Sequence, residues 1–238
     1  AHSIQYRYDA FGRVVEEKTD DISIKRKYSN DGNQIARQIY SGIEEISSAQ
    51  YDYDRNGQIE SFTEKGVSIE YEYDQNGNQI KIDYGNGIQT TYSYNLANLP
   101  TSITHTKNSN ILSQFNGYYS LDGNVVQISS NTGDTTKYTY DDLNRLIEET
   151  QNNGGITQTY SYSFDSFNNR RSLSASGASN YQVEYVYDKN NRLIKDVKKI
   201  DDKIETTKYF YDPNGNQVST NTEFLTTTSE EMSQSVSA

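Results

Sequence analysis

The chain has 238 residues, of which 22 are basic and 33 are acidic, so its formal net charge at pH 7 is -11. Nucleic acid is bound by clustered Lys and Arg, and the basic residues here are scattered among acidic ones, so we expect no nucleic-acid partner. There is no Cys and no apolar run long enough to cross a bilayer, which excludes disulfides and Cys-based zinc sites and argues against membrane insertion.

Tyrosine takes the place of scarce aliphatic residues. A chain this poor in Leu, Ile, Val and Phe would ordinarily be suspected of disorder. However, it contains 22 Tyr, and each can bury a ring while its hydroxyl forms a hydrogen bond. Their regular placement indicates an ordered protein whose core is built from tyrosine.

A short segment with one or two aromatic residues before a turn recurs ten times, at intervals of 20 to 25 residues. We number the copies as repeats 1 to 10. They read YRYDAFGR (6–13), KYSNDGN (27–33), YDYDRNGQ (51–58), YEYDQNGN (71–78), YSYNLANL (92–99), GYYSLDGN (117–124), YTYDDLNR (138–145), YSFDSFNN (162–169), YVYDKNNR (185–192) and YFYDPNGN (209–216).

Each repeat predicts a tight turn. The residue after the last aromatic, here called the opening residue, is Asp9, Ser29, Asp54, Asp74, Asn95, Ser120, Asp141, Asp165, Asp188 or Asp212. The closing residue, three positions later, is Gly12, Gly32, Gly57, Gly77, Asn98, Gly123, Asn144, Asn168, Asn191 or Gly215. Asp, Ser and Asn cap turns, and Gly and Asn tolerate a left-handed backbone, so the pattern predicts a type I turn with a G1 bulge.

The flanks of the turns predict strands. Val67, Ile69, Tyr71 and Tyr73 alternate with polar residues, which is typical of a strand that is buried on one face. The first and second tyrosines, three and one residues before the opening residue, form a predicted ladder that includes Tyr6, Tyr8, Tyr51, Tyr53, Tyr71, Tyr73, Tyr92, Tyr94, Tyr138, Tyr140, Tyr185, Tyr187, Tyr209 and Tyr211.

Turn-forming residues between the repeats mark opposite corners, so we predict an all-β fold with about two strands per repeat, joined as an antiparallel meander. Because strands twist, such a large sheet should curve and spiral. We expect residues 1–221 to form one domain of ten repeats. Residues 222–238 lose the repeat, and we expect them to form a polar, disordered tail.

The unit Y-x-Y-D-x-x-G-[NR]-x-[IVL] resembles the tyrosine-aspartate (YD) repeat of the RHS family, over residues 4 to about 220. The resemblance implies a β-sheet that spirals into part of a shell, as in bacterial polymorphic toxins and wall-associated proteins and, more distantly, in teneurins. It implies a non-enzymatic, secreted or cell-surface segment, and as partners the remainder of a longer RHS protein and its enclosed effector. The family's self-cleaving core signature is not recognisable here.

Calcium binding is one alternative for the turn motif. Asp52, Asp54 and Asn56, followed by Gly57, fit the first half of the loop D-x-[DN]-x-[DN]-G. Position twelve of that loop is Thr63 where a Glu is needed, and Asn95 to Asn98 keep the turn without carboxylates. These facts favour a structural turn, and we expect no metal or other cofactor.

Carbohydrate binding is a second alternative, since exposed tyrosines beside Asn and Asp would form a platform on which a sugar could stack. Catalysis has weaker support. The two histidines, His2 and His105, are far apart and no nucleophile pattern accompanies them. We therefore expect a structural protein first and a carbohydrate- or cell-surface-binding module second.

Overall fold

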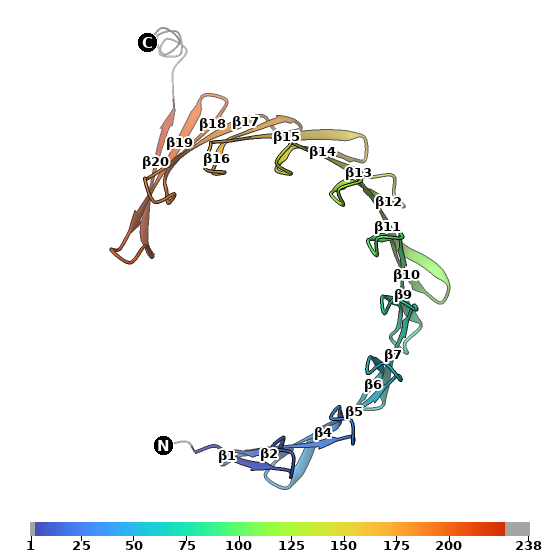
Figure 1. Cartoon of the computed structure of the whole chain (residues 1–238). Coiled ribbons are helices and arrows are strands. Elements are labelled where there is room, and N and C mark those ends of the chain that lie inside the picture. Colours follow the sequence, from blue (N-terminus) through green and yellow to red (C-terminus); the bar gives the residue numbers. More distant parts are fainter. Residues whose placement is uncertain (1–2, 227–238) are drawn as a thin grey trace. The chain divides into compact units, whose positions relative to one another are not determined.

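The computed structural model describes residues 3–226, and every regular element in that part of the chain is a β-strand (Figure 1). The predicted all-β fold is confirmed, with two strands per repeat and twenty strands in the described part of the chain. Within residues 3–226 there is no helix of the length and apolarity needed to cross a membrane.

The strands follow the chain without long connections. They are β1 (Gln5–Tyr8), β2 (Val14–Lys18), β3 (Ile22–Tyr28), β4 (Gln34–Ser41), β5 (Glu44–Tyr53), β6 (Ile59–Glu64), β7 (Val67–Tyr73), β8 (Gln79–Asp83), β9 (Ile88–Tyr94), β10 (Pro100–Lys107), β11 (Asn110–Tyr119), β12 (Val125–Ser130), β13 (Thr135–Tyr140), β14 (Leu146–Asn153), β15 (Ile156–Phe164), β16 (Arg170–Gly177), β17 (Tyr181–Tyr187), β18 (Leu193–Ile200), β19 (Lys203–Tyr211) and β20 (Gln217–Thr226).

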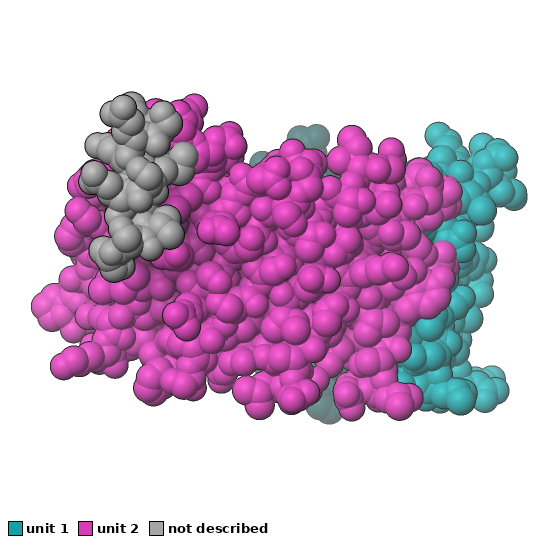
Figure 2. All heavy atoms as spheres, turned by 90° about the horizontal axis from the view of Figure 1, so that it is seen from above, with its two compact units in different colours: residues 1–115 teal, residues 116–238 magenta. Residues whose placement is uncertain are grey.

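The chain divides into two compact units, residues 1–115 and 116–238, which are coloured separately in Figure 2. In the N-terminal unit, β1 to β10 pair with their neighbours in sequence, and all the pairs are antiparallel. In the C-terminal unit, β12 to β20 do the same. Each unit is therefore a meander, as the alternating corners predict.

Each unit is a single layer, and this sets how deeply its side chains are buried. The most buried residues include Ala49, Thr90 and Val183, which all lie five residues before an opening residue and so on the same face as the tyrosines. Most ladder tyrosines are half-buried, and Tyr6 and Tyr8 are exposed. The expected tyrosine core is thus a covering of rings over one face, because no second layer packs on it within residues 3–226.

The C-terminal boundary differs from the expectation. The predicted tail begins at residue 222, whereas β20 continues to Thr226. Thr222 pairs with Thr207 and Thr226 with Lys203, so β20 follows β19 over the whole length of that strand. Backbone pairing needs no repeat signature, and sequence periodicity therefore placed the end of the strand too early. Residues 227–238 lie outside the described part of the chain.

Candidate functional site: the turns and the tyrosine ladder

All ten predicted turns have the same backbone geometry. The closing residue has φ between 57° and 96°, and its N–H donates to the carbonyl of the opening residue at 2.9 to 3.2 Å. The opening N–H in turn donates to the carbonyl of the residue four positions later, here called the trailing residue, at 2.8 to 3.0 Å. In the hairpins of repeats 1 to 5 and 7 to 10 the register shifts beside the second aromatic residue, as between Glu72 and Tyr73. This is the bulge that accompanies such a turn.

The side chain of the opening residue also holds the turn together. In every repeat its Oδ1 or Oγ accepts the N–H of the trailing residue at 2.8 to 3.2 Å. Hydrogen bonds from the Asn78 side chain and from turn amides lower the pKa of Asp74 below its ordinary value, and the Arg145 side chain and amide do the same for the pKa of Asp141. The carboxylates of the motif therefore accept hydrogen bonds from their own turns.

Several trailing residues connect their turn to the next one. The side-chain amide or guanidinium of the trailing residue donates to the Oδ1 of the closing Asn one repeat further on. The four pairs are Asn78 to Asn98 (2.8 Å), Asn124 to Asn144 (2.9 Å), Arg145 to Asn168 (2.8 Å) and Asn169 to Asn191 (3.0 Å). Where the closing residue is Gly77, its backbone carbonyl accepts from Gln58 at 3.0 Å instead. A closing Asn thus supplies both the left-handed backbone and an acceptor between repeats.

Trailing arginines add an aromatic contact. Arg13, Arg145 and Arg192 each donate to the opening Asp of their own turn. Each guanidinium also lies over the second aromatic ring of the next repeat, which is Tyr28, Phe164 or Tyr211, at 4.7 to 5.0 Å from the ring centroid. Each of these arginine side chains therefore links its own turn to a ring of the next repeat.

The second tyrosine connects neighbouring repeats through its hydroxyl. In six repeats this hydroxyl donates to the backbone carbonyl that lies five residues after the previous opening residue, at 2.7 to 3.0 Å. The pairs are Tyr28 to Val14, Tyr53 to Gln34, Tyr73 to Ile59, Tyr94 to Gln79, Tyr140 to Val125 and Tyr211 to Leu193. These carbonyls lie beyond the last backbone pair between the two strands, so the hydroxyl supplies the partner that the ladder lacks there.

First tyrosines have more varied surroundings. Tyr51 contacts the Phe62 ring across the hairpin at 5.2 Å. Tyr209 donates its hydroxyl to Asp196 at 2.7 Å, and this bond, together with burial, raises the pKa of Tyr209 to about 12. Burial also raises the pKa of Tyr92 and of Tyr138, so these two hydroxyls stay protonated at neutral pH, which suits a role in holding strands together.

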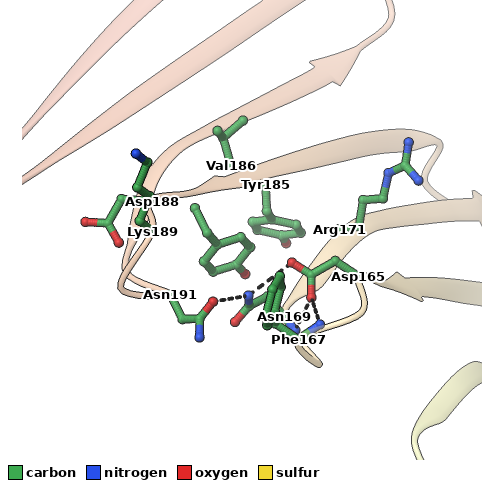
Figure 3. A pocket seen from close by; sticks show the side chains of 10 residues that line it. Asp165, Phe167, Asn169, Arg171, Tyr185, Val186, Asp188, Lys189 and Asn191 are labelled. Atoms are coloured by element: carbon green, nitrogen blue, oxygen red, sulfur yellow. Dashed lines mark hydrogen bonds between the residues drawn. The ribbon is translucent and has the colours of Figure 1, made fainter.

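Two grooves lie between successive turns at equivalent places. One, of about 540 Å³, lies between repeats 8 and 9 and is lined by residues that include Asn169, Tyr185 and Asn191 (Figure 3). The other, of about 480 Å³, lies between repeats 4 and 5, where Tyr92 and Asn98 take the corresponding places. In both, a tyrosine ring lies near an Asn from the inter-turn bond, so the grooves are a product of the repeat itself.

The residues of the calcium alternative do not converge. The Asp52 carboxylate accepts from Ser61 across the hairpin, whereas Asp54 accepts the amides of Asn56 and Gln58. Across residues 3–226 no cluster of three acidic or histidine side chains is arranged to hold a metal ion. His105 forms a 2.9 Å hydrogen bond with Thr90, and His2 lies outside the described residues.

Sequence reasoning did not assign a role to the trailing residue, although the signature contains it as Asn or Arg. Its partners belong to the following turn, 20 or more residues away in sequence. The sequence did contain one signal for this bond, which is the presence of Asn instead of Gly at some closing positions. Both residues adopt the left-handed conformation, but only Asn has a side-chain oxygen that can accept a hydrogen bond.

A family model described as RHS Repeat matches residues 73–109 and 119–156, which include the turns of repeats 4 to 7. Among solved structures, the Photorhabdus luminescens Tc holotoxin pore is similar over 92% of this chain, with 14% identity and a TM-score of 0.63. The chain contains RHS repeats. The predicted family is thereby confirmed by the repeat signature and by the fold together.

Two further structures are similar to this chain. The crystal structure of TcdB2-TccC3 without its hypervariable C-terminal region matches 93% of the chain with a TM-score of 0.62, and that of TcdB2-TccC3 matches 92% with a TM-score of 0.61, both at 14% identity. The chain spans only 15 to 16% of the length of these structures. At this identity the likeness concerns the fold. Among curated proteins, none matches.

Proposed function

We propose that this chain is a non-enzymatic segment of the wall of a β-shell, and that the shell encloses or displays a toxin or another effector. The observation that carries the proposal is the use of side-chain chemistry between repeats. Opening residues cap their own turns, trailing residues bond to the next turn, and second tyrosines bond to the previous repeat. These groups serve to extend a sheet.

The fold of the Tc toxin structures supports the same proposal, since it matches nearly the whole chain. A wall segment would be one part of a longer polypeptide that contains the effector, and the small share of those chains that is covered fits this idea. We further propose that the protein acts outside the cell or at the cell surface.

The test is limited proteolysis of the full reading frame that contains this chain. We expect part of the flanking polypeptide to resist protease in the wild type. It should become cleavable when Tyr73→Ala and Tyr94→Ala remove two of the hydroxyl bonds between repeats. Ile43→Ala, at a fully exposed corner, is the matched control and should leave protection unchanged. Equal cleavage of the flanking polypeptide in the wild type and in the variant with Tyr73→Ala and Tyr94→Ala would refute enclosure.

The two equivalent grooves favour one second candidate, a module that binds carbohydrate. Tyr92 and Tyr185 are the first tyrosines that line them, each near an Asn side chain. If this candidate is right, a glycan array should give a hit that Tyr92→Leu and Tyr185→Leu together abolish while the circular dichroism spectrum is retained. Tyr71→Leu, a ladder residue that lines neither groove, should bind like the wild type.

A further inference from the structure

Repeat 2 has an arginine at the place where most repeats have the first tyrosine. This residue is Arg26, and its partner in the register of β3 and β4 is Arg37. In repeats 4, 5 and 8 the same two places hold a tyrosine and an aliphatic residue, namely Tyr71 with Ile82, Tyr92 with Ile103 and Tyr162 with Leu173. Opposite residues have Cβ atoms about 5 Å apart, so two positive charges lie side by side on the face that carries the ladder tyrosines, here called the tyrosine face.

Each of the two arginines has one carboxylate contact. Arg26 Nη2 lies 3.2 Å from Glu17 Oε2. Arg37 Nη2 lies 3.4 Å from Glu64 Oε1, and the same oxygen accepts a hydrogen bond from the Ser47 hydroxyl. A guanidinium has five N–H donors, so one contact for each leaves most donors of the pair for other partners.

Two of the remaining donor nitrogens are buried without an acceptor. They are Nη1 of Arg26 and Nε of Arg37, and neither has a hydrogen-bond partner among residues 3–226. An unpaired N–H of a charged group costs free energy when it is buried, because it has lost water and gained no other acceptor. An acceptor that approached both arginines would remove that cost.

The arginine pair can be reached from the open side of the sheet. The Arg26 side chain keeps 22% of its surface exposed and the Arg37 side chain keeps 33%. No second layer packs on the tyrosine face within residues 3–226. Both side chains have several rotatable bonds, so their unpaired N–H groups can turn toward a ligand that arrives from this side.

We propose that Arg26 and Arg37 together bind one carboxylate group. A carboxylate has two oxygens in a plane, and these accept hydrogen bonds from one guanidinium bidentately or from two guanidiniums at once. Glu17 and Glu64 already balance the two positive charges, so a monoanion meets less repulsion than a phosphate dianion would. The site does not depend on the proposed enclosure of an effector.

An acetate titration followed by NMR tests the proposal. The Arg37 Nε–H signal is the one that Arg37→Ile removes from the proton–nitrogen correlation spectrum. We expect sodium acetate to shift this signal, in comparison with sodium chloride at equal ionic strength. The Arg7 Nε–H signal is the internal control and should not shift, because Arg7 lies between Tyr6 and Tyr8 in β1 and therefore on the other face.

A double variant restores the pair that other repeats have. Arg26→Tyr with Arg37→Ile reproduces Tyr71 and Ile82, and circular dichroism should show that the chain is folded. In the wild type, acetate at a few times its dissociation constant should raise the melting temperature by roughly 2–4 °C over chloride, and the double variant should show no such rise. Arg7→Gln is the matched control and should respond like the wild type.

Two further probes identify the ligand more closely, namely sodium phosphate and aspartate blocked at both its amino and its α-carboxyl ends. A response to blocked aspartate as well as to acetate would assign the site to an acidic side chain, and a response to acetate alone would assign it to a small free carboxylate. Phosphate should shift the Arg37 signal less than acetate does, and a larger shift would overturn the assignment to a carboxylate. An Arg37 signal that acetate leaves in place would refute the proposal, and so would an equal rise in the melting temperature of the double variant.

Discussion

At the scale of single residues, the structure gives hydrogen-bond partners to the opening residue of every repeat and to the second tyrosine of several. The second tyrosine illustrates this well, because its ring covers the neighbouring strand and its hydroxyl satisfies a carbonyl that no backbone amide reaches. In repeat 8 this residue is Phe164, which keeps the ring and its contact with Arg145 but has no hydroxyl. Repeat 8 therefore lacks this one hydrogen bond, whereas the ring remains in place.

Exchanging Phe and Tyr at the second position should change stability in opposite directions. Tyr73→Phe leaves the Ile59 carbonyl without its partner, and we expect a loss of about 1 kcal/mol in the free energy of unfolding. Phe164→Tyr should restore the bond and gain up to about 1 kcal/mol, since Tyr28 shows that a stacked arginine and a bonded hydroxyl are compatible. Urea unfolding measures both. Tyr71→Phe is the control, and an equal loss there would contradict the argument.

At the scale of the turn, one side chain holds the backbone of its own hairpin and another ties that hairpin to the next. A closing Asn meets both needs, since it accepts a left-handed φ and offers an oxygen to the previous turn. Substitutions at this position can separate the two effects.

Asn144→Gly should keep the turn and lose the bond from Asn124, at a cost of about 1 kcal/mol in the free energy of unfolding. Asn144→Ala should lose the same bond and in addition strain the left-handed backbone, by roughly 1–2 kcal/mol more. Denaturant unfolding of the two variants tests this order. If Ala proved as stable as Gly, the left-handed conformation would not be needed at residue 144.

The opening aspartates make stability depend on pH. Hydrogen bonds from their turns lower the pKa of Asp74, Asp141, Asp188 and Asp212 below the ordinary value of 3.8. A lowered pKa means that the stabilisation is present above the unfolded-state pKa and is lost as the pH falls through the folded-state pKa. We therefore expect stability to fall below about pH 4.

Asn95 already caps one turn without a charge, so Asp74→Asn should fold at neutral pH. A fourfold variant in which Asn replaces Asp74, Asp141, Asp188 and Asp212 should lose less stability on acidification than the wild type. Thermal unfolding between pH 5 and about pH 3 measures this loss. An unchanged acid profile in the fourfold variant would show that other groups control it.

At the scale of the whole chain, the contacts between strands of residues 3–226 join sequence neighbours. Stability in such proteins is approximately a sum of repeat and nearest-neighbour contributions. Here those contributions are strand pairing, the inter-turn bonds and the tyrosine bonds, all of which recur in both compact units.

Local damage should therefore remain local. Tyr73→Ala should raise hydrogen exchange in β6 to β8, because Tyr73 lies on β7, pairs with β8 and bonds to β6, and it should leave β17 to β19 near wild-type protection. Exchange measured by mass spectrometry resolves the two regions. Uniform loss of protection over both would indicate global cooperativity and contradict the nearest-neighbour description.

The sequence by itself determined the turns, the strands and their order, because period-two patterning and turn chemistry are local properties. The left-handed closing residues and the capping opening residues are examples. Only the tertiary structure decided what the trailing Asn and Arg bond to, how far the rings are covered, and that β20 extends to Thr226. Those features depend on residues a full repeat or more away in sequence and on the absence of a second layer over the sheet of each unit, and local patterns carry neither kind of information.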